Sequence, residues 1–138
     1  MQHDAFIGQV QARAHLPSRG AAEGATRATL ETLGERIPEQ LADHVAAQLP
    51  SEIGVSLRRT EVLSGAGTGE RFDLNEFIQR VATRSGMDEP GAAYSCRVVL
   101  EVMREATQGG VMNKIRDALP EQLRELVDAG SSGEMRTT

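Results

Sequence analysis

Two pairs of glutamates are the residues in this sequence whose type and spacing best suit chemistry. Glu31 and Glu35 form the first pair, and Glu101 and Glu105 form the second. A spacing of four residues places two carboxylates on the same face of a helix. Two such pairs could bind a divalent cation or act as general acid and base.

Arg27 and Arg97 each precede a glutamate pair by one helical turn and can form weak ion pairs with it. At about 100° per residue, the pairs lie opposite the apolar positions Leu30, Leu33 and Leu100 and should therefore face water. We expect a solvated, charge-paired surface at these six positions, with a metal or recognition site as the alternative. No Glu-x-x-His motif occurs, so the di-iron arrangement of helical bundles is not supported.

The other residue types that often carry chemistry lack a suitable pattern. His3, His15 and His44 do not have the spacing of metal ligands, and we expect surface residues. Cys96 lies within an apolar helical stripe, which favours core packing over a nucleophile. The glycine-rich segment 65–70 has no following Lys-Ser or Lys-Thr, which favours a flexible linker over a phosphate-binding loop.

Three methionines in the second half of the chain suggest a different function. Met87, Met103 and Met112 could line an adaptable pocket for a small apolar ligand. The simpler interpretation is that they fill gaps in the core.

Composition predicts a helical domain in the cytoplasm. The 138 residues are 39% hydrophobic but include only one Tyr, three Phe and no Trp, so the core must be largely aliphatic. One cysteine excludes an intramolecular disulfide, and neither a signal sequence nor a membrane-spanning run is present. The net charge of −5 argues against nucleic acid and anionic membranes as partners.

Apolar periodicity and breaking residues predict eight helices. In the first half they occupy residues 4–15 and about 21–36, then start at Pro38 and at Ser51. In the second half they start at Asp73 and Asp88, then follow Gly109-Gly110 and Pro120. The predicted organisation is a first repeat at 1–59, a Gly-rich connector at 60–72, a second repeat at 73–128 and a disordered tail at 129–138. Val62-Leu63 and Arg71-Phe72 could alternatively flank a short hairpin.

The two halves are copies of one another. The segment that begins at Phe6 recurs 71 positions later at Phe77, with identities that include Ile7/Ile78, Val10/Val81 and Arg13/Arg84. At a displacement of 70, the first glutamate pair recurs as the second pair, and Leu49-Pro50 recurs as Leu119-Pro120. We therefore expect an all-α fold of two tandem, pseudo-symmetric four-helix units that share a core.

The duplicated pattern resembles a bacterial family known as domain of unknown function 2267. The resemblance lies in Glu76-Phe77-Ile78, Val81 to Arg84, Arg97 to Glu101 and Leu119 to Leu123, together with their first-half counterparts. It covers essentially the whole chain except the tail. It implies an all-helical bacterial domain with no assigned activity, cofactor or catalytic residues.

These observations predict a non-enzymatic protein-interaction or adaptor module without a cofactor. A protein partner or self-association is expected, with homodimerisation as the simplest choice. The alternative is a small apolar-ligand-binding protein with a Met-lined pocket. An enzyme of unrecognised chemistry is the third hypothesis for the function.

Overall fold

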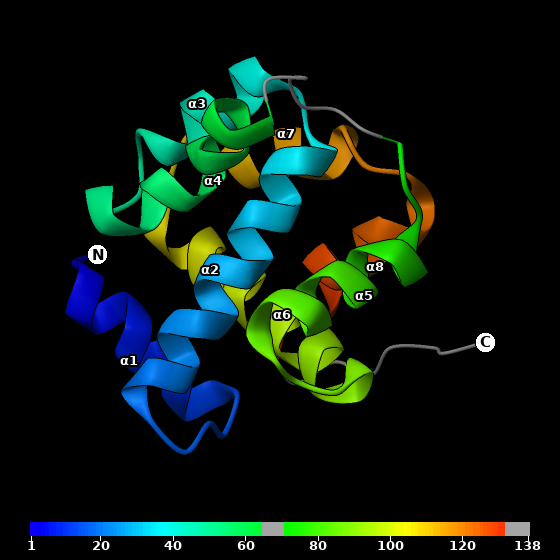
Figure 1. Cartoon of the computed structure of the whole chain (residues 1–138). Coiled ribbons are helices and arrows are strands. Elements are labelled where there is room, and N and C mark those ends of the chain that lie inside the picture. Colours follow the sequence, from blue (N-terminus) through cyan, green and yellow to red (C-terminus); the bar gives the residue numbers. More distant parts are fainter. Residues whose placement is uncertain (65–70, 132–138) are drawn as a thin grey trace.

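The computed structural model describes residues 1–64 and 71–131, except for the side chains of residues 59–64. Within these residues the backbone forms eight α-helices and no strand, which confirms the predicted all-α class (Figure 1). The helices are α1 (His3–Arg13), α2 (Arg19–Arg36), α3 (Glu39–Ala46), α4 (Ser51–Ser64), α5 (Leu74–Ser85), α6 (Glu89–Ala106), α7 (Val111–Asp117) and α8 (Glu121–Ala129).

Several helix ends are fixed by residues that the sequence identifies. The Asp73 side chain accepts a hydrogen bond of 2.9 Å from the Glu76 N–H, and that of Asp88 accepts one of 2.8 Å from the Gly91 N–H. These caps satisfy N–H groups that would otherwise lack a partner at the starts of α5 and α6. Gly86 ends α5 with a φ of 76°, a left-handed conformation that suits glycine. The predicted starts of both helices and the predicted end of α5 are confirmed.

The boundary after α4 differs from the prediction. The helix continues to Ser64, so the first five residues of the predicted connector are helical. The glycines begin only at Gly65, and nothing from Thr60 to Ser64 breaks a helix. The alternative of a short hairpin is excluded, because Val62 and Leu63 belong to α4. Residues 65–70 of the connector and 132–138 of the tail lie outside the described residues.

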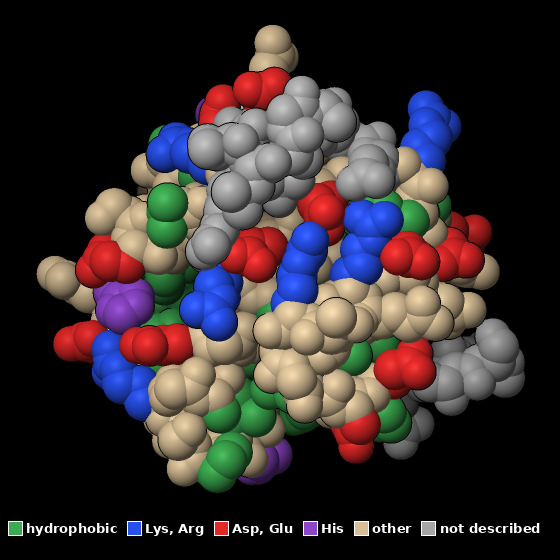
Figure 2. Space-filling model, viewed as in Figure 1, with side chains coloured by type: hydrophobic (Ala, Val, Ile, Leu, Met, Phe, Trp, Pro, Cys, Tyr) green, Lys and Arg blue, Asp and Glu red, His purple; other side chains and the backbone are tan. Residues whose placement is uncertain are grey.

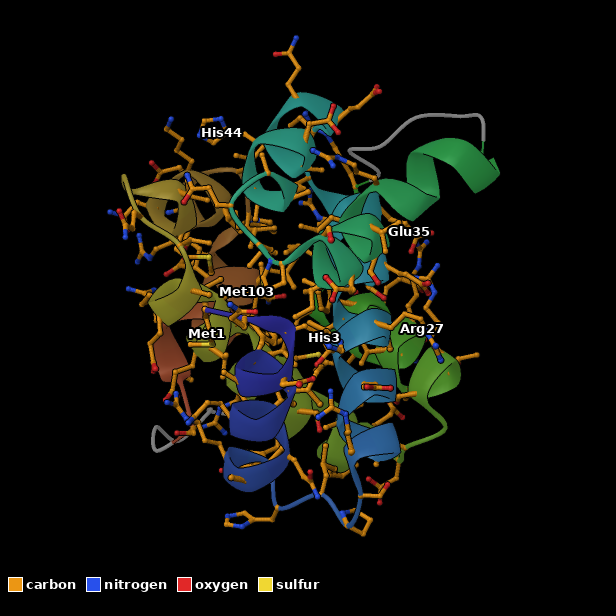
Figure 3. All side chains as sticks on the ribbon, turned by 90° about the vertical axis from the view of Figure 1, so that its left-hand side faces the viewer. Met1, His3, Arg27, Glu35, His44 and Met103 are labelled. Carbon is orange, nitrogen blue, oxygen red and sulfur yellow. The ribbon has the colours of Figure 1, made fainter. Side chains whose placement is uncertain are left out.

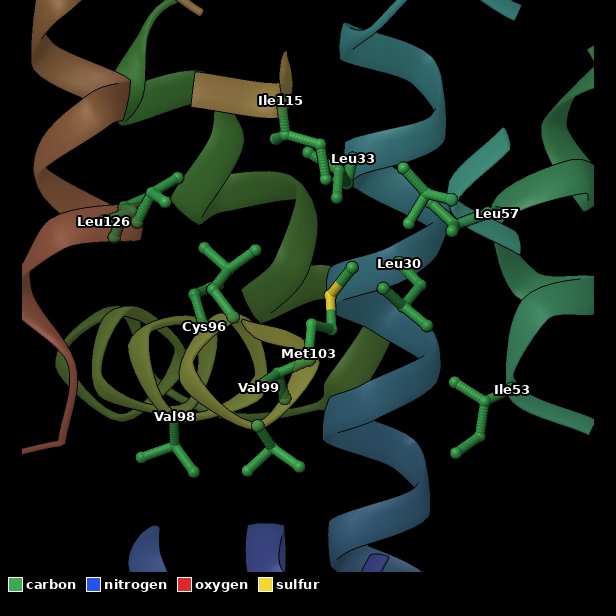
Figure 4. Packing of buried hydrophobic residues seen from close by; sticks show 14 of the residues in the cluster. Leu30, Leu33, Ile53, Leu57, Cys96, Val98, Val99, Met103, Ile115 and Leu126 are labelled. Atoms are coloured by element: carbon green, nitrogen blue, oxygen red, sulfur yellow. The ribbon is translucent and has the colours of Figure 1, made fainter. Parts of the chain in front are cut away.

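The two longest helices, α2 and α6, lie at the centre of the fold. A single hydrophobic cluster includes residues from all eight described helices. Leu30 and Leu33 of α2 and Met103 of α6 are completely or almost completely buried, and Leu57 of α4 packs with them (Figure 4). The aliphatic core expected from composition is confirmed.

Helices from opposite ends of the chain pack against each other. α1 contacts both α2 and α6, and α5 likewise contacts both α6 and α2. Each of the two central helices is therefore contacted by a short helix from the other half, in addition to helices of its own half. No described helix is long and apolar enough to cross a membrane.

Candidate functional site

The first glutamate pair lies between α2 and α5. Arg84 Nη1 is 2.6 Å from Glu35 Oε1, and Arg84 Nε is 3.9 Å from Glu31 Oε1. Arg80 Nη1 is 3.4 Å from the same Glu35 oxygen. Only 16% of the Glu31 side chain and 14% of the Glu35 side chain are exposed. The prediction that this pair faces water is wrong, because α5 packs over that face of α2.

Charge attraction, rather than a directed hydrogen bond, holds the buried oxygen of Glu35. Oε1 has no hydrogen-bond partner among the described residues, although two guanidinium groups lie within ion-pair distance. Arg84 Nη1 donates instead to the Thr32 hydroxyl at 2.8 Å. Arg80 also packs over the Phe72 ring, 3.9 Å from its centre. Acidic and basic side chains lie side by side on the face over α2 and α5 (Figure 2).

The second glutamate pair is bound by an arginine from α1. Arg13 Nη1 lies 2.8 Å from Glu101 Oε1 and 2.6 Å from Glu105 Oε2, and Arg13 Nη2 donates to Glu105 Oε1 at 2.8 Å. Hydrogen bonding and the positive charge of Arg13 lower the pKa of Glu105. Glu101 also accepts a hydrogen bond of 3.1 Å from the Ser131 hydroxyl.

Arg27 and Arg97 do not pair with the glutamates that follow them. Arg27 is exposed and forms no ion pair with any described residue. Arg97 is 9% exposed, donates from Nε to the Gly130 carbonyl at 3.0 Å and lies over the Tyr94 ring at 5.4 Å. The six predicted residues therefore do not form one surface, and Arg27 and Glu35 share a side of α2 without sharing a partner (Figure 3).

Sequence reasoning missed the arginines that bind the glutamate pairs, Arg13 and Arg84. A signal for them exists, because they occupy equivalent positions in the duplicated segment, 71 residues apart. Their guanidinium groups lie within ion-pair distance of all four carboxylates and so occupy these groups. Within the described residues no group of three His, Cys, Asp or Glu side chains could hold a metal ion.

The remaining candidates occupy separate places. Cys96 is completely buried, which confirms the core prediction, and burial raises the pKa of its thiol to about 12. His44 is exposed, as predicted.

Met103 has no exposed surface, and Met87 accepts a hydrogen bond from the Ser95 hydroxyl. Met112 lines a small hollow of about 140 Å³ that neither of the other methionines lines.

A hollow of about 290 Å³ between α1, α2 and α4 was not predicted. Ile7 and Ile53 are among the apolar residues that line it, and Arg27, Glu23 and Glu52 contribute charged groups. Green apolar atoms are visible at its floor, beside a purple histidine (Figure 2).

Val55 also lines this hollow, and 58% of the residue is exposed. Two residues along a helix correspond to a rotation of about 200°, so Val55 points away from the stripe formed by Ile53 and Leu57. In the sequence, this surface is indicated by one apolar residue, Val55, on the otherwise polar side of α4.

Comparison with known proteins identifies a family but no activity. A family model described as "Uncharacterized conserved protein (DUF2267)" matches residues 3–126 of the chain. The comparison with curated proteins finds no match.

Proposed function

Since the chain belongs to the DUF2267 family, we propose that it is a non-enzymatic protein-interaction module whose partner is a second copy of itself. The hollow between α1, α2 and α4 is the contact surface in this proposal. The tandem arrangement of two pseudo-symmetric four-helix units, predicted from the duplication, is the scaffold that presents this surface.

The observation that carries the proposal is the exposure of Val55 beside this hollow. Val55 is 58% exposed, whereas the hydrophobic side chains around it in α4, Ile53 and Leu57, are 3% and 0% exposed. An apolar side chain next to a concave surface with an apolar floor and a charged rim is typical of protein contact sites. Burial of Val55 in an interface would remove this apolar area from water and thereby favour association.

The charges on the rim favour a second copy over an unrelated partner. In a twofold dimer the same surface patch faces itself, so charged groups in the patch can pair across the interface only if both signs are present. Arg27 is positive and has no ion pair with any described residue. Glu52 is exposed, accepts a hydrogen bond from the Ser51 hydroxyl and likewise has no ion pair with a described residue. Arg27 of one copy can therefore face Glu52 of the other.

Two correspondences support the tandem arrangement. Phe6 and Phe77, which the duplication pairs, are 0% and 1% exposed. Arg13 and Arg84, also paired by the duplication, each bind two carboxylates on the long central helix of the other half. Because these carboxylates are already bound by arginine, they support a structural role for the charged residues rather than catalysis.

Light scattering coupled to size-exclusion chromatography tests self-association. We expect the protein to form dimers at micromolar concentration and Val55→Asp to be monomeric, because the aspartate would place a charge in the apolar contact. Gln122→Asp, a change at an exposed position of α8, should leave the dimer intact.

A charge exchange tests the orientation of the two copies. Arg27→Glu and Glu52→Arg should each weaken the dimer because they place like charges opposite one another, and the double variant should restore it. A monomer at every concentration would refute the proposal. A small molecule retained in native mass spectrometry, with no dimer, would instead favour the apolar-ligand alternative.

A further inference from the structure

A second hollow, of about 360 Å³, has a different chemical character. It lies where the end of α2 meets the starts of α3 and α8. Arg36 and Arg71 line it, together with Pro38, Ala118, Leu119 and Pro120. We propose that this hollow binds a phosphate monoester, with the phosphate on the two arginines and the organic group against the prolines and Leu119.

The two arginines supply positive charge that the described residues do not neutralise. Neither Arg36 nor Arg71 forms an ion pair with a described acidic residue, in contrast to Arg13, Arg80 and Arg84. Burial and the neighbouring charge of Arg71 lower the pKa of Arg36, as expected for a cation without a counter-ion. An anion in the hollow would offset both effects.

The Arg36 guanidinium is held in place before any ligand binds. Its Nε donates to the Phe72 carbonyl at 3.0 Å, and the guanidinium carbon lies 5.9 Å from the centre of the Phe72 ring. The Nη groups are not used by these contacts and can donate to an oxyanion. Fixing a donor in advance reduces the entropy lost on binding.

The helices around the hollow add to the positive potential. Pro38 and Pro120 occupy the N-cap positions of α3 and α8, and neither helix has a side-chain cap. Their first-turn N–H groups therefore carry the positive end of the helix dipole. The first-turn acids Glu39 and Glu121 offset part of this charge, but they are exposed and do not line the hollow.

The lining selects a phosphate monoester over simpler anions. Two guanidinium groups match the two negative charges of a monoester near neutral pH, whereas a carboxylate carries only one. Pro38, Leu119 and Pro120 form an apolar wall that inorganic phosphate would leave uncovered. The volume lies within the range of small-molecule sites, roughly 300–1,000 Å³.

Titration calorimetry with phenyl phosphate tests the proposal on the full chain. We expect phenyl phosphate to bind, and benzoate and inorganic phosphate to bind about ten-fold more weakly or not at all. Arg71→Gln should weaken phenyl phosphate binding by about ten-fold or more, because one charged donor is lost. Arg104→Gln removes an exposed arginine of α6 that does not line the hollow and should bind as the wild type does.

Arg36→Lys provides a second variant that keeps the charge near Phe72 but removes the forked donor, and it should also bind more weakly. The absence of phenyl phosphate binding, or an equal loss in Arg71→Gln and Arg104→Gln, would overturn the site. Equal affinity for inorganic phosphate and phenyl phosphate would overturn the assignment to a monoester. None of these residues lines the proposed dimer surface, so either proposal can fail without the other.

Discussion

Arg13 and Arg84 determine the environment of the four glutamates that first suggested chemistry. Each arginine lies on a short helix and binds two carboxylates on a central helix from the other half of the chain. The two sites are not equally enclosed, because the Glu35 side chain is 14% exposed and that of Glu105 is 45% exposed. Removing one partner of an ion pair costs more stability when less water surrounds the pair, because the remaining charge is left unpaired. Loss of a glutamate should therefore cost more at the α2–α5 site than at the α1–α6 site.

Glu35→Gln should lower the free energy of unfolding by about 1–2 kcal/mol, between the values for exposed and for buried ion pairs. The variant removes the charge that Arg80 and Arg84 share. Urea denaturation followed by circular dichroism measures the change. Glu125→Gln, the same change at an exposed position of α8 that lines neither hollow and forms no ion pair with a described residue, is the control and should have little effect. Equal effects of the two variants would contradict the assigned role of Glu35.

Cys96 should be unreactive in the folded protein. Burial raises the pKa of its thiol to about 12, so almost no thiolate is present at pH 8. A thiol-specific disulfide reagent should react rapidly in urea but only at the rate of unfolding in native buffer. Rapid labelling of the native protein would contradict the buried position.

The same pKa predicts a loss of stability at alkaline pH. The folded pKa of Cys96 lies above its unfolded value of about 8.5, so its stabilising contribution is complete below that pH and declines as pH rises. Between pH 8 and pH 10 the wild type should lose more stability than Cys96→Ala, which has no thiol to ionise. Parallel pH profiles of the two proteins would contradict this prediction.

At the scale of elements, the approach of α2 to α4 depends on one glycine. A methyl group at Gly34 would lie 2.5 Å from the Leu57 carbonyl oxygen, closer than the two helix backbones allow. Gly24 lies on the same helix and has open space around its Cα. The two glycines therefore differ in packing while sharing the same secondary structure.

Gly34→Ala should destabilise the protein by about 1–3 kcal/mol, because α4 has to move away from α2. Gly24→Ala should instead stabilise it by about 0.5–1 kcal/mol, since alanine is the better helix former. Urea denaturation of both variants measures the difference. A stabilising Gly34→Ala would show that α2 and α4 are farther apart than described.

The elements were largely predictable, whereas the faces of the central helices were not. Asp73, Asp88 and Gly86 act within one turn of chain, so their effects can be deduced from local sequence. The environment of Glu31 and Glu35 depends on α5, which lies far along the sequence. Helical periodicity shows which face of a helix is polar but not which other helix covers that face.

Thr32 illustrates the same limit. It is polar by sequence and yet buried, and it donates its hydroxyl hydrogen to the Ala28 carbonyl, four residues earlier, at 2.8 Å. This bond satisfies the hydroxyl without water, so the residue can be buried on a helix that has neighbours on several sides. The hollow near Val55 could be suspected from one misplaced apolar residue, but its shape depends on how three helices meet.

At the scale of the whole molecule, the shared core couples the two halves. α1 covers part of α6 and α5 covers part of α2, and one cluster joins all described helices. Neither half can therefore bury its own apolar face alone. A structure of this kind should unfold as one cooperative unit.

Circular dichroism and the fluorescence of Tyr94, the only tyrosine, should report the same unfolding transition in urea. A fragment of residues 73–138 should show little helix, because it lacks the α2 surface against which α5 packs. Two separate transitions, or a folded fragment, would contradict the coupling of the halves.

The ion pairs that join each short helix to the central helix of the other half also have a consequence for synthesis on the ribosome. α2 leaves the exit tunnel before α5 has been translated, so Glu35 stays hydrated until Arg80 and Arg84 emerge. Arg13 can form its ion pairs only later, after Glu101 and Glu105 have been translated. The nascent chain can therefore complete this part of its fold only after α6 has been made.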